Sequence, residues 1–161
     1  MKKYLITAVF AIGFLFVSQA QEVSKNAIGI RVGDSDGFGT ELNYQRYIGE
    51  NNRLEFGLGW RSNNDIDAFK LTGLHQWVWN IDGGLNWYAG VGGGVGSIGF
   101  DDDRYPGVDN EVFVFVAGDV GIEYNFDIPL MLSLDFRPEF GFGDYRDDVD
   151  LDIGLGIRYQ F

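Results

Sequence analysis

Hydrophobic and polar residues alternate with a period of two along most of the chain after residue 26. The pattern is cleanest in VDLDIGLGIRYQF (149–161), where every odd position is apolar or aromatic and every even position is polar or glycine. Successive side chains of a β-strand point to opposite faces, so this spacing predicts strands with one apolar and one polar face. No segment after residue 26 shows a helical period, and we therefore expect an all-β fold.

The alternation predicts eight strands, at residues 27–33, 38–47, 53–61, 68–80, 86–100, 111–124, 130–143 and 149–161. Strands of about ten residues suit a tilted crossing of about 30 Å of hydrocarbon, whereas strands of soluble sandwiches more often have five or six. Pro138 removes one ladder hydrogen bond from its strand, which is a cost of this interpretation.

The connections between these strands form two alternating sets. IGENN, IDGG and NFDIP belong to one set, and the more acidic DSDG, SNNDID, DDDRYPGVDNE and DYRDD belong to the other. An even number of strands places both chain ends on the side of the first set. We expect the first set to be periplasmic turns and the second set to be extracellular loops.

The first twenty residues, MKKYLITAVFAIGFLFVSQA, have two lysines, an apolar run and a small-residue ending. These are the parts of a cleaved secretory signal peptide, so we expect a leader at 1–20 and one domain at 21–161. The sequence contains no later run of about 18 apolar residues, which a membrane-spanning helix would need. The chain has no cysteine and a net charge of −12, which exclude a disulfide framework and argue against nucleic acid as a partner.

A sheet that spans a membrane must close into a barrel, because lipid cannot pair with the backbone groups of an open edge. We predict an eight-stranded antiparallel up-and-down transmembrane β-barrel whose polar face points inward. An interior of this size is filled by side chains, so we interpret its ionisable residues as an ion-pair network, with a narrow conducting pore as the alternative. These residues are Arg31, Glu41, Glu55, Arg61, Lys70, Asp119, Glu123, Asp135, Arg137, Glu139, Asp150, Asp152 and Arg158.

Glycines occupy positions 90, 92, 94 and 96 on the same predicted inward face. A nucleotide-binding glycine loop needs a helix after it, and none is predicted here. We expect these glycines to leave room for long Arg and Tyr side chains from opposite strands.

Two stretches resemble a known family. The ending GIRYQF, with Tyr159 and Phe161, resembles the C-terminal signal of bacterial outer-membrane β-barrels that the barrel-assembly machinery recognises. HQWVWNIDGGLNWYAGVGGGVG (75–96) resembles the central hairpin of small outer-membrane barrels of the Bacteroidetes group. The resemblance implies an OmpA/OmpX-like barrel in the outer membrane of a Gram-negative cell, with a structural or surface-interaction role, and it brings no catalytic residues.

Few residues suggest further chemistry, and we expect no cofactor. Asp101, Asp102, Asp103, Asp109 and Glu111 offer oxygen ligands for a divalent cation, which could bridge to an extracellular partner, but they lack the spacing of an EF-hand. Some eight-stranded barrels are lipid-modifying enzymes that use a histidine. Here that would be His75 with Ser62, Ser97 or Ser133, none of which lies in a nucleophile motif, and we expect no enzyme.

One alternative from another class remains open on the sequence. An exported soluble lipocalin-like barrel that binds a small apolar ligand would have the same strands, but its apolar face would point inward and its charges outward. The two interpretations therefore differ in the direction of every side chain.

Overall fold

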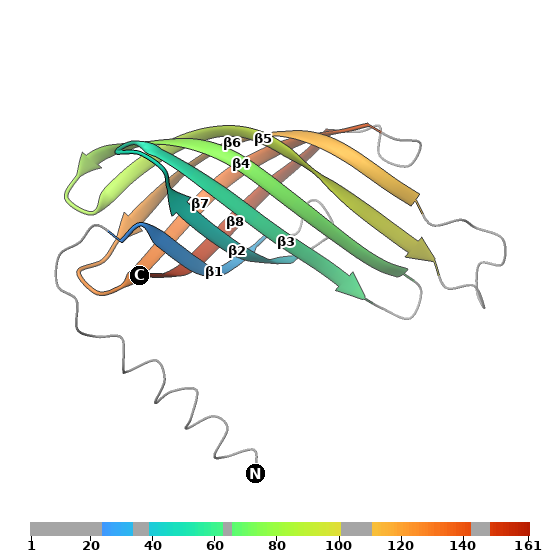
Figure 1. Ribbon diagram of the computed structural model, residues 1–161, viewed down its shortest axis with the longest axis horizontal. Coiled ribbons are helices and arrows are strands. Elements are labelled where there is room, and N and C mark those ends of the chain that lie inside the picture. Colours follow the sequence, from blue (N-terminus) through green and yellow to red (C-terminus); the bar gives the residue numbers. More distant parts are fainter. Residues whose placement is uncertain (1–23, 34–38, 63–65, 101–110, 143–148) are drawn as a thin grey trace, which may run out of the picture.

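The computed structural model describes residues 24–33, 39–62, 66–100, 111–142 and 149–161, and these form a closed barrel of antiparallel strands in chain order (Figure 1). The strands are β1 (Asn26–Val32), β2 (Thr40–Tyr47), β3 (Asn52–Ser62), β4 (Ile66–Asp82), β5 (Leu85–Phe100), β6 (Glu111–Asn125), β7 (Leu130–Phe142) and β8 (Val149–Gln160). The predicted all-β, eight-stranded up-and-down barrel is confirmed. No helix in the described part of the chain is long and apolar enough to cross a membrane.

The barrel closes where β1 pairs with β8. Ile28 lies opposite Tyr159 and Ile30 lies opposite Ile157 in this ladder. The seam continues beyond β8, because Asn26 and Phe161 exchange two backbone hydrogen bonds of 2.9 and 3.1 Å. The last strand therefore pairs to its final residue, which leaves no open edge.

The turns 48–51, 83–84 and 126–129 lie at the same end of the barrel as Asn26 and Phe161, on the left of Figure 1. We call this the turn end, and the opposite end the loop end. The tightest of these turns joins β4 to β5. Gly83 there has a φ of +51°, which only glycine adopts readily, and the Asn80 side chain donates to the Gly83 carbonyl at 2.9 Å.

Two details of the strands differ from the sequence pattern. β2 begins at Thr40 because Gly39, with a φ of +73°, does not continue the strand. Pro138 lies within β7 and points outward. Its ladder to β8 is continuous through Leu151, whereas the ladder to β6 has a gap between the pairs Ala117–Glu139 and Val120–Phe136. The proline therefore interrupts the ladder between β7 and β6 but leaves the ladder between β7 and β8 intact.

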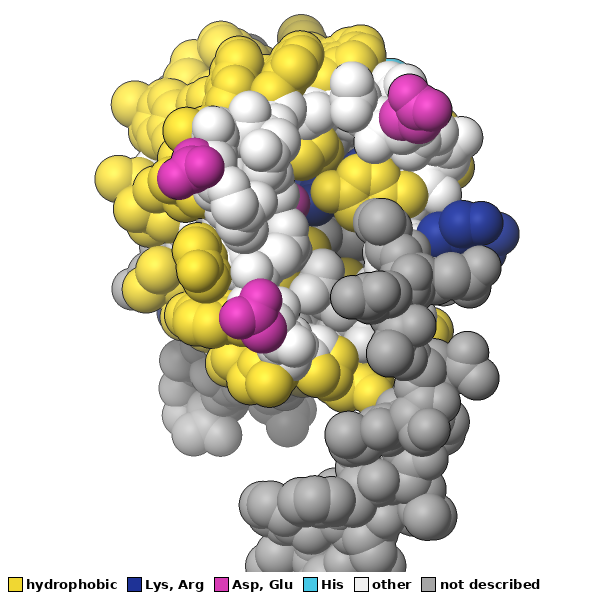
Figure 2. All heavy atoms as spheres, turned by 90° about the vertical axis from the view of Figure 1, so that its left-hand side faces the viewer, with side chains coloured by type: hydrophobic (Ala, Val, Ile, Leu, Met, Phe, Trp, Pro, Cys, Tyr) yellow, Lys and Arg dark blue, Asp and Glu magenta, His cyan; other side chains and the backbone are white. Residues whose placement is uncertain are grey.

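The two faces of the barrel have opposite chemistry. Outward side chains such as Ile153 and Leu155 are 63% and 64% exposed, and hydrophobic groups cover the sides of the barrel seen from the turn end (Figure 2). Arg31 and Arg53 point inward and are 1% and 0% exposed. A soluble lipocalin-like barrel requires the reverse arrangement, so this alternative was wrong.

Candidate functional site: the charged barrel interior

Every strand contributes buried polar side chains to the barrel interior. Side chains of a β-strand point alternately to its two faces, so every second residue of each strand points into the barrel. There it meets the inward residues of the other strands. The buried charged residues are Arg31, Glu41, Arg53, Glu55, Lys70, Asp119, Glu123, Asp135, Arg137, Glu139, Asp152 and Arg158. Seven of these are acidic and five are basic, so the described interior has an excess of two acids.

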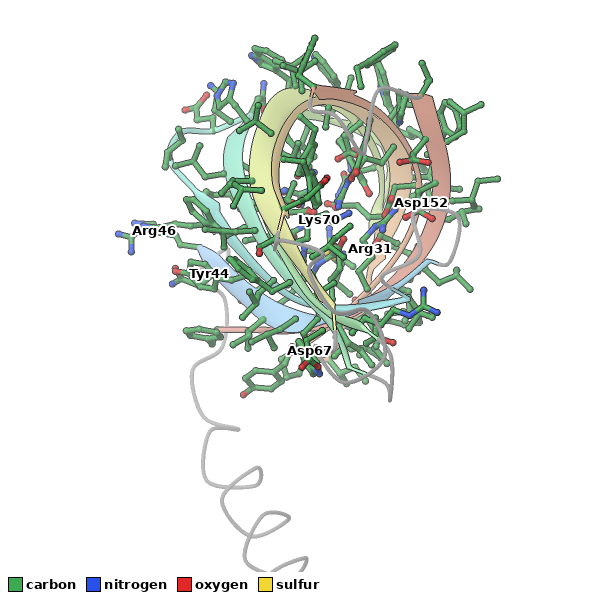
Figure 3. All side chains as sticks on the ribbon, turned by 90° about the vertical axis from the view of Figure 1, so that its right-hand side faces the viewer. Arg31, Tyr44, Arg46, Asp67, Lys70 and Asp152 are labelled. Atoms are coloured by element: carbon green, nitrogen blue, oxygen red, sulfur yellow. The ribbon has the colours of Figure 1, made fainter. Side chains whose placement is uncertain are left out.

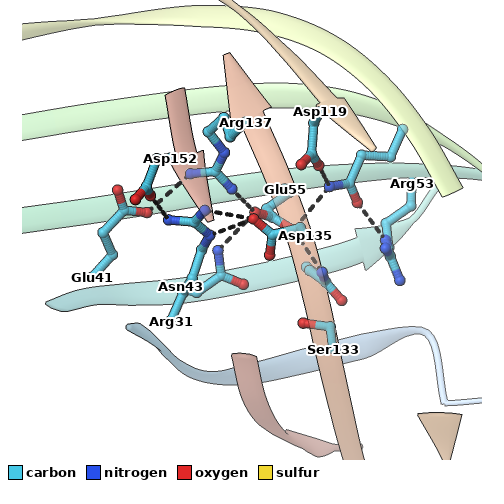
Figure 4. Close-up of polar contacts among 12 residues, drawn as sticks. Arg31, Glu41, Asn43, Arg53, Glu55, Asp119, Ser133, Asp135, Arg137 and Asp152 are labelled. Atoms are coloured by element: carbon cyan, nitrogen blue, oxygen red, sulfur yellow. Dashed lines mark hydrogen bonds and ion pairs between the residues drawn. The ribbon is translucent and has the colours of Figure 1, made fainter. Parts of the chain in front are cut away.

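Two arginines connect strands that are not neighbours in the sequence (Figure 4). The guanidinium of Arg137 on β7 donates to Glu55 at 2.7 Å and to Glu41 at 3.1 Å. Arg31 on β1 donates from Nε to Asp135 at 2.8 Å and from Nη1 to Asp152 at 2.6 Å. Each guanidinium thus holds two carboxylates, and together they tie β1, β2, β3, β7 and β8 across the interior.

Lys70 and Arg158 extend the network on either side of this pair. The Lys70 ammonium lies 3.0 Å from Glu139 and 3.2 Å from Glu41. Arg158 donates to Asn43 and to Ser133 and lies 3.6 Å from Glu55. Neutral polar groups therefore supply some of the hydrogen bonds of the network, although buried atoms such as Arg158 Nη2 and Arg137 Nε have no hydrogen-bond partner among the described residues.

A second group of contacts is built around Arg53, and Gln76 connects it to Glu55 of the network above through a hydrogen bond of 3.0 Å. The Arg53 guanidinium donates to Glu123 at 2.7 Å and to Gln76 at 2.8 Å, and it lies over the rings of Tyr88 and Tyr47 at 5.0 and 5.5 Å. Arg53 was not among the residues predicted for the interior. Its position two residues before Glu55 places it on the same inward face, so the alternation contained the signal.

Asp119 is the exception among the buried acids. It accepts a hydrogen bond from the Gln76 amide, but none of the described cations lies within ion-pair distance of it. Its second carboxylate oxygen, Oδ1, is buried and has no hydrogen-bond partner. Arg137 on the neighbouring strand is directed to Glu41 and Glu55 instead.

An apolar sector occupies the β4–β6 side of the interior. It consists of Leu74, Phe113, Phe115 and Ala117. A Cβ at Gly94 would overlap the Phe115 ring, and one at Gly96 would overlap the Phe113 ring. The expectation that these glycines make room for Arg and Tyr from opposite strands was therefore wrong at these two positions, because phenylalanines of the adjacent strand fill the space.

Two of the ionisable residues predicted for the interior are placed differently. Arg61 holds an inward position opposite Ala68, but its side chain is exposed because β3 ends one residue later. Arg61 therefore does not share the burial of the other residues predicted for the lumen network. Asp150 is only half-buried, near the start of β8.

The acidic loop lies mostly outside the described residues. Its acidic residues outside the described part of the chain are Asp101, Asp102, Asp103 and Asp109. Glu111 is described, and it is half-buried as the first residue of β6. Among the residues that the structure describes, no three acidic, His or Cys side chains are grouped to hold a metal ion.

Among the side chains that the structure describes, none forms a catalytic triad with His75. The His75 side chain lies on the outward face and packs edge-on against Trp77 with ring centroids 4.6 Å apart. Ser133 is inside the barrel and hydrogen-bonded to Arg158. Ser97 is six residues from Val91, the β5 residue that pairs with His75, which is about 20 Å along the strand. Of Ser62 only the backbone is described.

Comparisons with known proteins support the architecture. The chain matches no family model, and its sequence matches none of the curated proteins. The fold is similar to the N-terminal β-barrel domain of OprF from Pseudomonas aeruginosa, with a TM-score of 0.63 and 13% identity over 86% of this chain and 99% of that one. It is also similar to Ail, the attachment invasion locus protein of Yersinia pestis, with a TM-score of 0.62 and 19% identity over 86% and 97%. Neisserial surface protein A gives a TM-score of 0.53 and 12% identity over 84% and 94%. These likenesses show the fold of a small transmembrane β-barrel.

Proposed function

We propose that this protein is an integral outer-membrane β-barrel with a structural or surface-interaction role and a side-chain-filled lumen. The observation that supports this best is the largely apolar outer face. Residues such as Val114, Ile122, Leu134 and Leu155 are about half exposed on strands that also carry buried ion pairs. Water would not stabilise such a surface, whereas hydrocarbon would, and most of the buried charges form ion pairs inside the barrel.

Aromatic side chains at the turn end support the same placement. Trp79 stacks on Trp87 at 4.4 Å, Tyr124 contacts Phe126 edge-on at 4.8 Å, and all four are exposed. Amphipathic rings are enriched where hydrocarbon meets headgroups. In this proposal the turn end faces the periplasm and the acidic loops face outward.

We assign this protein a role at the cell surface and not a catalytic role. Two of the similar folds belong to an attachment invasion locus protein and to a surface protein, which supports a role in contact with the cell's surroundings. The hairpin 75–96 resembles that of small Bacteroidetes outer-membrane barrels, and this resemblance supports a barrel of that type. The acidic loop 101–111, with or without a divalent cation, is the segment we assign to contact with an extracellular partner.

Export and assembly follow from the two chain ends in this proposal. The leader 1–20 would direct secretion and be removed. Tyr159 and Phe161 would present the C-terminal signal to the barrel-assembly machinery, and their outward rings, 6.3 Å apart, lie at the turn end. The barrel would then insert among outer-membrane lipids.

The first test is electrophoretic mobility of the protein from a purified outer-membrane fraction, with and without boiling. A closed membrane barrel stays folded in detergent until it is heated, so we expect two different mobilities. Equal mobility, together with recovery of the protein in the soluble periplasmic fraction, would contradict the proposal.

Tryptophan quenching gives a second, independent test in reconstituted vesicles. Trp60, Trp77, Trp79 and Trp87 all lie on the outer face. Lipids brominated on their acyl chains should quench their fluorescence, whereas a water-soluble quencher should have little effect. The opposite result would show that these rings do not face lipid.

A further inference from the structure

Two charged residues interrupt the apolar outer face within the regular ladders of the described strands. Arg46 lies at an outward position of β2, opposite Asn26 of β1 and Leu54 of β3. Asp67 lies at an outward position of β4, near its loop end. Both side chains are exposed, and Figure 3 shows Arg46 pointing away from the barrel wall.

These two charges mark opposite borders of one apolar band. On β3, Leu54 pairs with Arg46 and Ser62 pairs with Asp67, a separation of eight residues. This corresponds to about 26 Å along the strand, or about 20 Å of height for a strand tilted by about 40°. The apolar band of outer-membrane barrels is about 25 Å tall. The two charges are therefore separated by roughly the height of such a band, and Arg46 is the one toward the turn end.

The guanidinium of Arg46 has no hydrogen bond or ion pair with the described residues. Asn26 is the ladder partner of Arg46 on β1, and its Oδ1 accepts a hydrogen bond from the Tyr44 hydroxyl at 2.8 Å. The carboxylates at this end, on Glu50, Asp82 and Asp127, are exposed in or beside turns and none of them pairs with it. Figure 2 shows acidic side chains set apart from one another around this rim.

We propose that Arg46 binds the phosphate of a glycerophospholipid in the leaflet at the turn end. This inference rests on the proposed membrane insertion. A guanidinium presents several N–H donors in a planar fork that matches two phosphate oxygens, and this bidentate contact is stronger than a single hydrogen bond. Tyr44, two residues away on the same face, places an aromatic ring at the depth where headgroups meet hydrocarbon. In this position the phosphate of the phospholipid contacts the guanidinium, and its acyl chains lie against the apolar and aromatic side chains of the outer face.

The experiment follows arginine side-chain Nε–Hε signals by NMR in a protein labelled with ¹⁵N-arginine. The barrel is prepared in maltoside micelles, which carry no phosphate, and dihexanoylphosphatidylcholine is then added stepwise. We expect a saturable shift of the Arg46 signal, which Arg46→Gln identifies by its absence. The signal of Arg61, which is exposed near the loop end, is the internal control and should move little.

A parallel titration with inorganic phosphate separates a lipid headgroup from a free anion. An equal shift with inorganic phosphate at the same concentration, or no shift with the phospholipid, would overturn the proposal. Arg46→Lys should keep part of the effect when lipid retention is compared by native mass spectrometry, whereas Arg46→Gln should retain one phospholipid fewer. Boiling-dependent mobility is recorded for each sample, so a failure of membrane-barrel folding is distinguished from a failure of this site.

Discussion

Arg31 on the first strand and Asp152 on the last strand form a buried ion pair of 2.6 Å across the seam at which the barrel closes. Arg31 also holds Asp135 on β7. Replacing Arg31 with Met should lower the free energy of unfolding by about 3–5 kcal/mol, because two buried carboxylates lose their cation. Urea unfolding of the barrel in lipid vesicles, followed by tryptophan fluorescence, measures this. Lys25→Met, which removes an exposed cation at the turn end, should change the value by less than about 1 kcal/mol.

Asp119 should tolerate loss of its charge better than Asp135 does. Asp119→Asn removes one of the excess acids from a site without a paired cation, so we expect a loss of less than about 1 kcal/mol. Asp135→Asn weakens a hydrogen-bonded ion pair with Arg31 and should cost about 2–3 kcal/mol. The same urea titration compares the two variants. Equal losses would show that Asp119 is held by an attraction that the structure does not contain.

The packing of Phe113 over Gly96 should be detectable as coupling between the two positions. Gly96→Ala places a methyl group against the Phe113 ring and should cost about 1–3 kcal/mol. Combining it with Phe113→Leu should recover part of the loss, because the smaller side chain gives way. A double-mutant cycle measures this coupling, and purely additive losses would contradict the steric explanation.

The outer face should tolerate charge according to depth. Val116 lies near the middle of β6 and Val112 lies one residue from its loop end, and both point outward. Val116→Lys should cost about 2–4 kcal/mol in a bilayer, and Val112→Lys about 0–1 kcal/mol, because the ammonium near the border reaches water. Measurement in vesicles of defined thickness tests this. Equal costs at both positions would place the hydrocarbon band elsewhere on the barrel.

Phe161 should matter for assembly in the cell more than for stability. Its backbone completes the seam with Asn26, and this pairing does not need the aromatic side chain. Phe161→Ala should therefore reduce the amount of heat-modifiable protein in the outer membrane, while the free energy of unfolding of refolded protein changes by less than about 1 kcal/mol. Leu132→Ala, at an exposed outward position of β7, is the matched control and should assemble normally. A similar decrease for both variants would show that the C-terminal ring is not a specific signal.

The alternation of residue types was sufficient to predict the number of strands and the face of nearly every side chain. Leu74 and Val78 are apolar, but by position both fall on the polar face of strand 68–80, and both are buried inside the barrel. This works because the period of two is a local property of an extended backbone. Arg61 is exposed at an inward position because alternation gives the direction of a side chain but not the point at which the wall around it ends.

The partners within the interior were decided by the tertiary structure alone. Arg31 and Asp135 are 104 residues apart, and Arg137 and Glu41 are 96 apart, so no local pattern could join them. Closure between β1 and β8, with the stagger of each ladder, brings these groups to the same height in a space that excludes water. The same closure leaves Asp119 without a cation and fills the glycine tract with phenylalanine rings. The sequence by itself thus determined which residues point inward, and only the closed barrel decided what each of them contacts, because contact depends on distances around the ring and not along the chain.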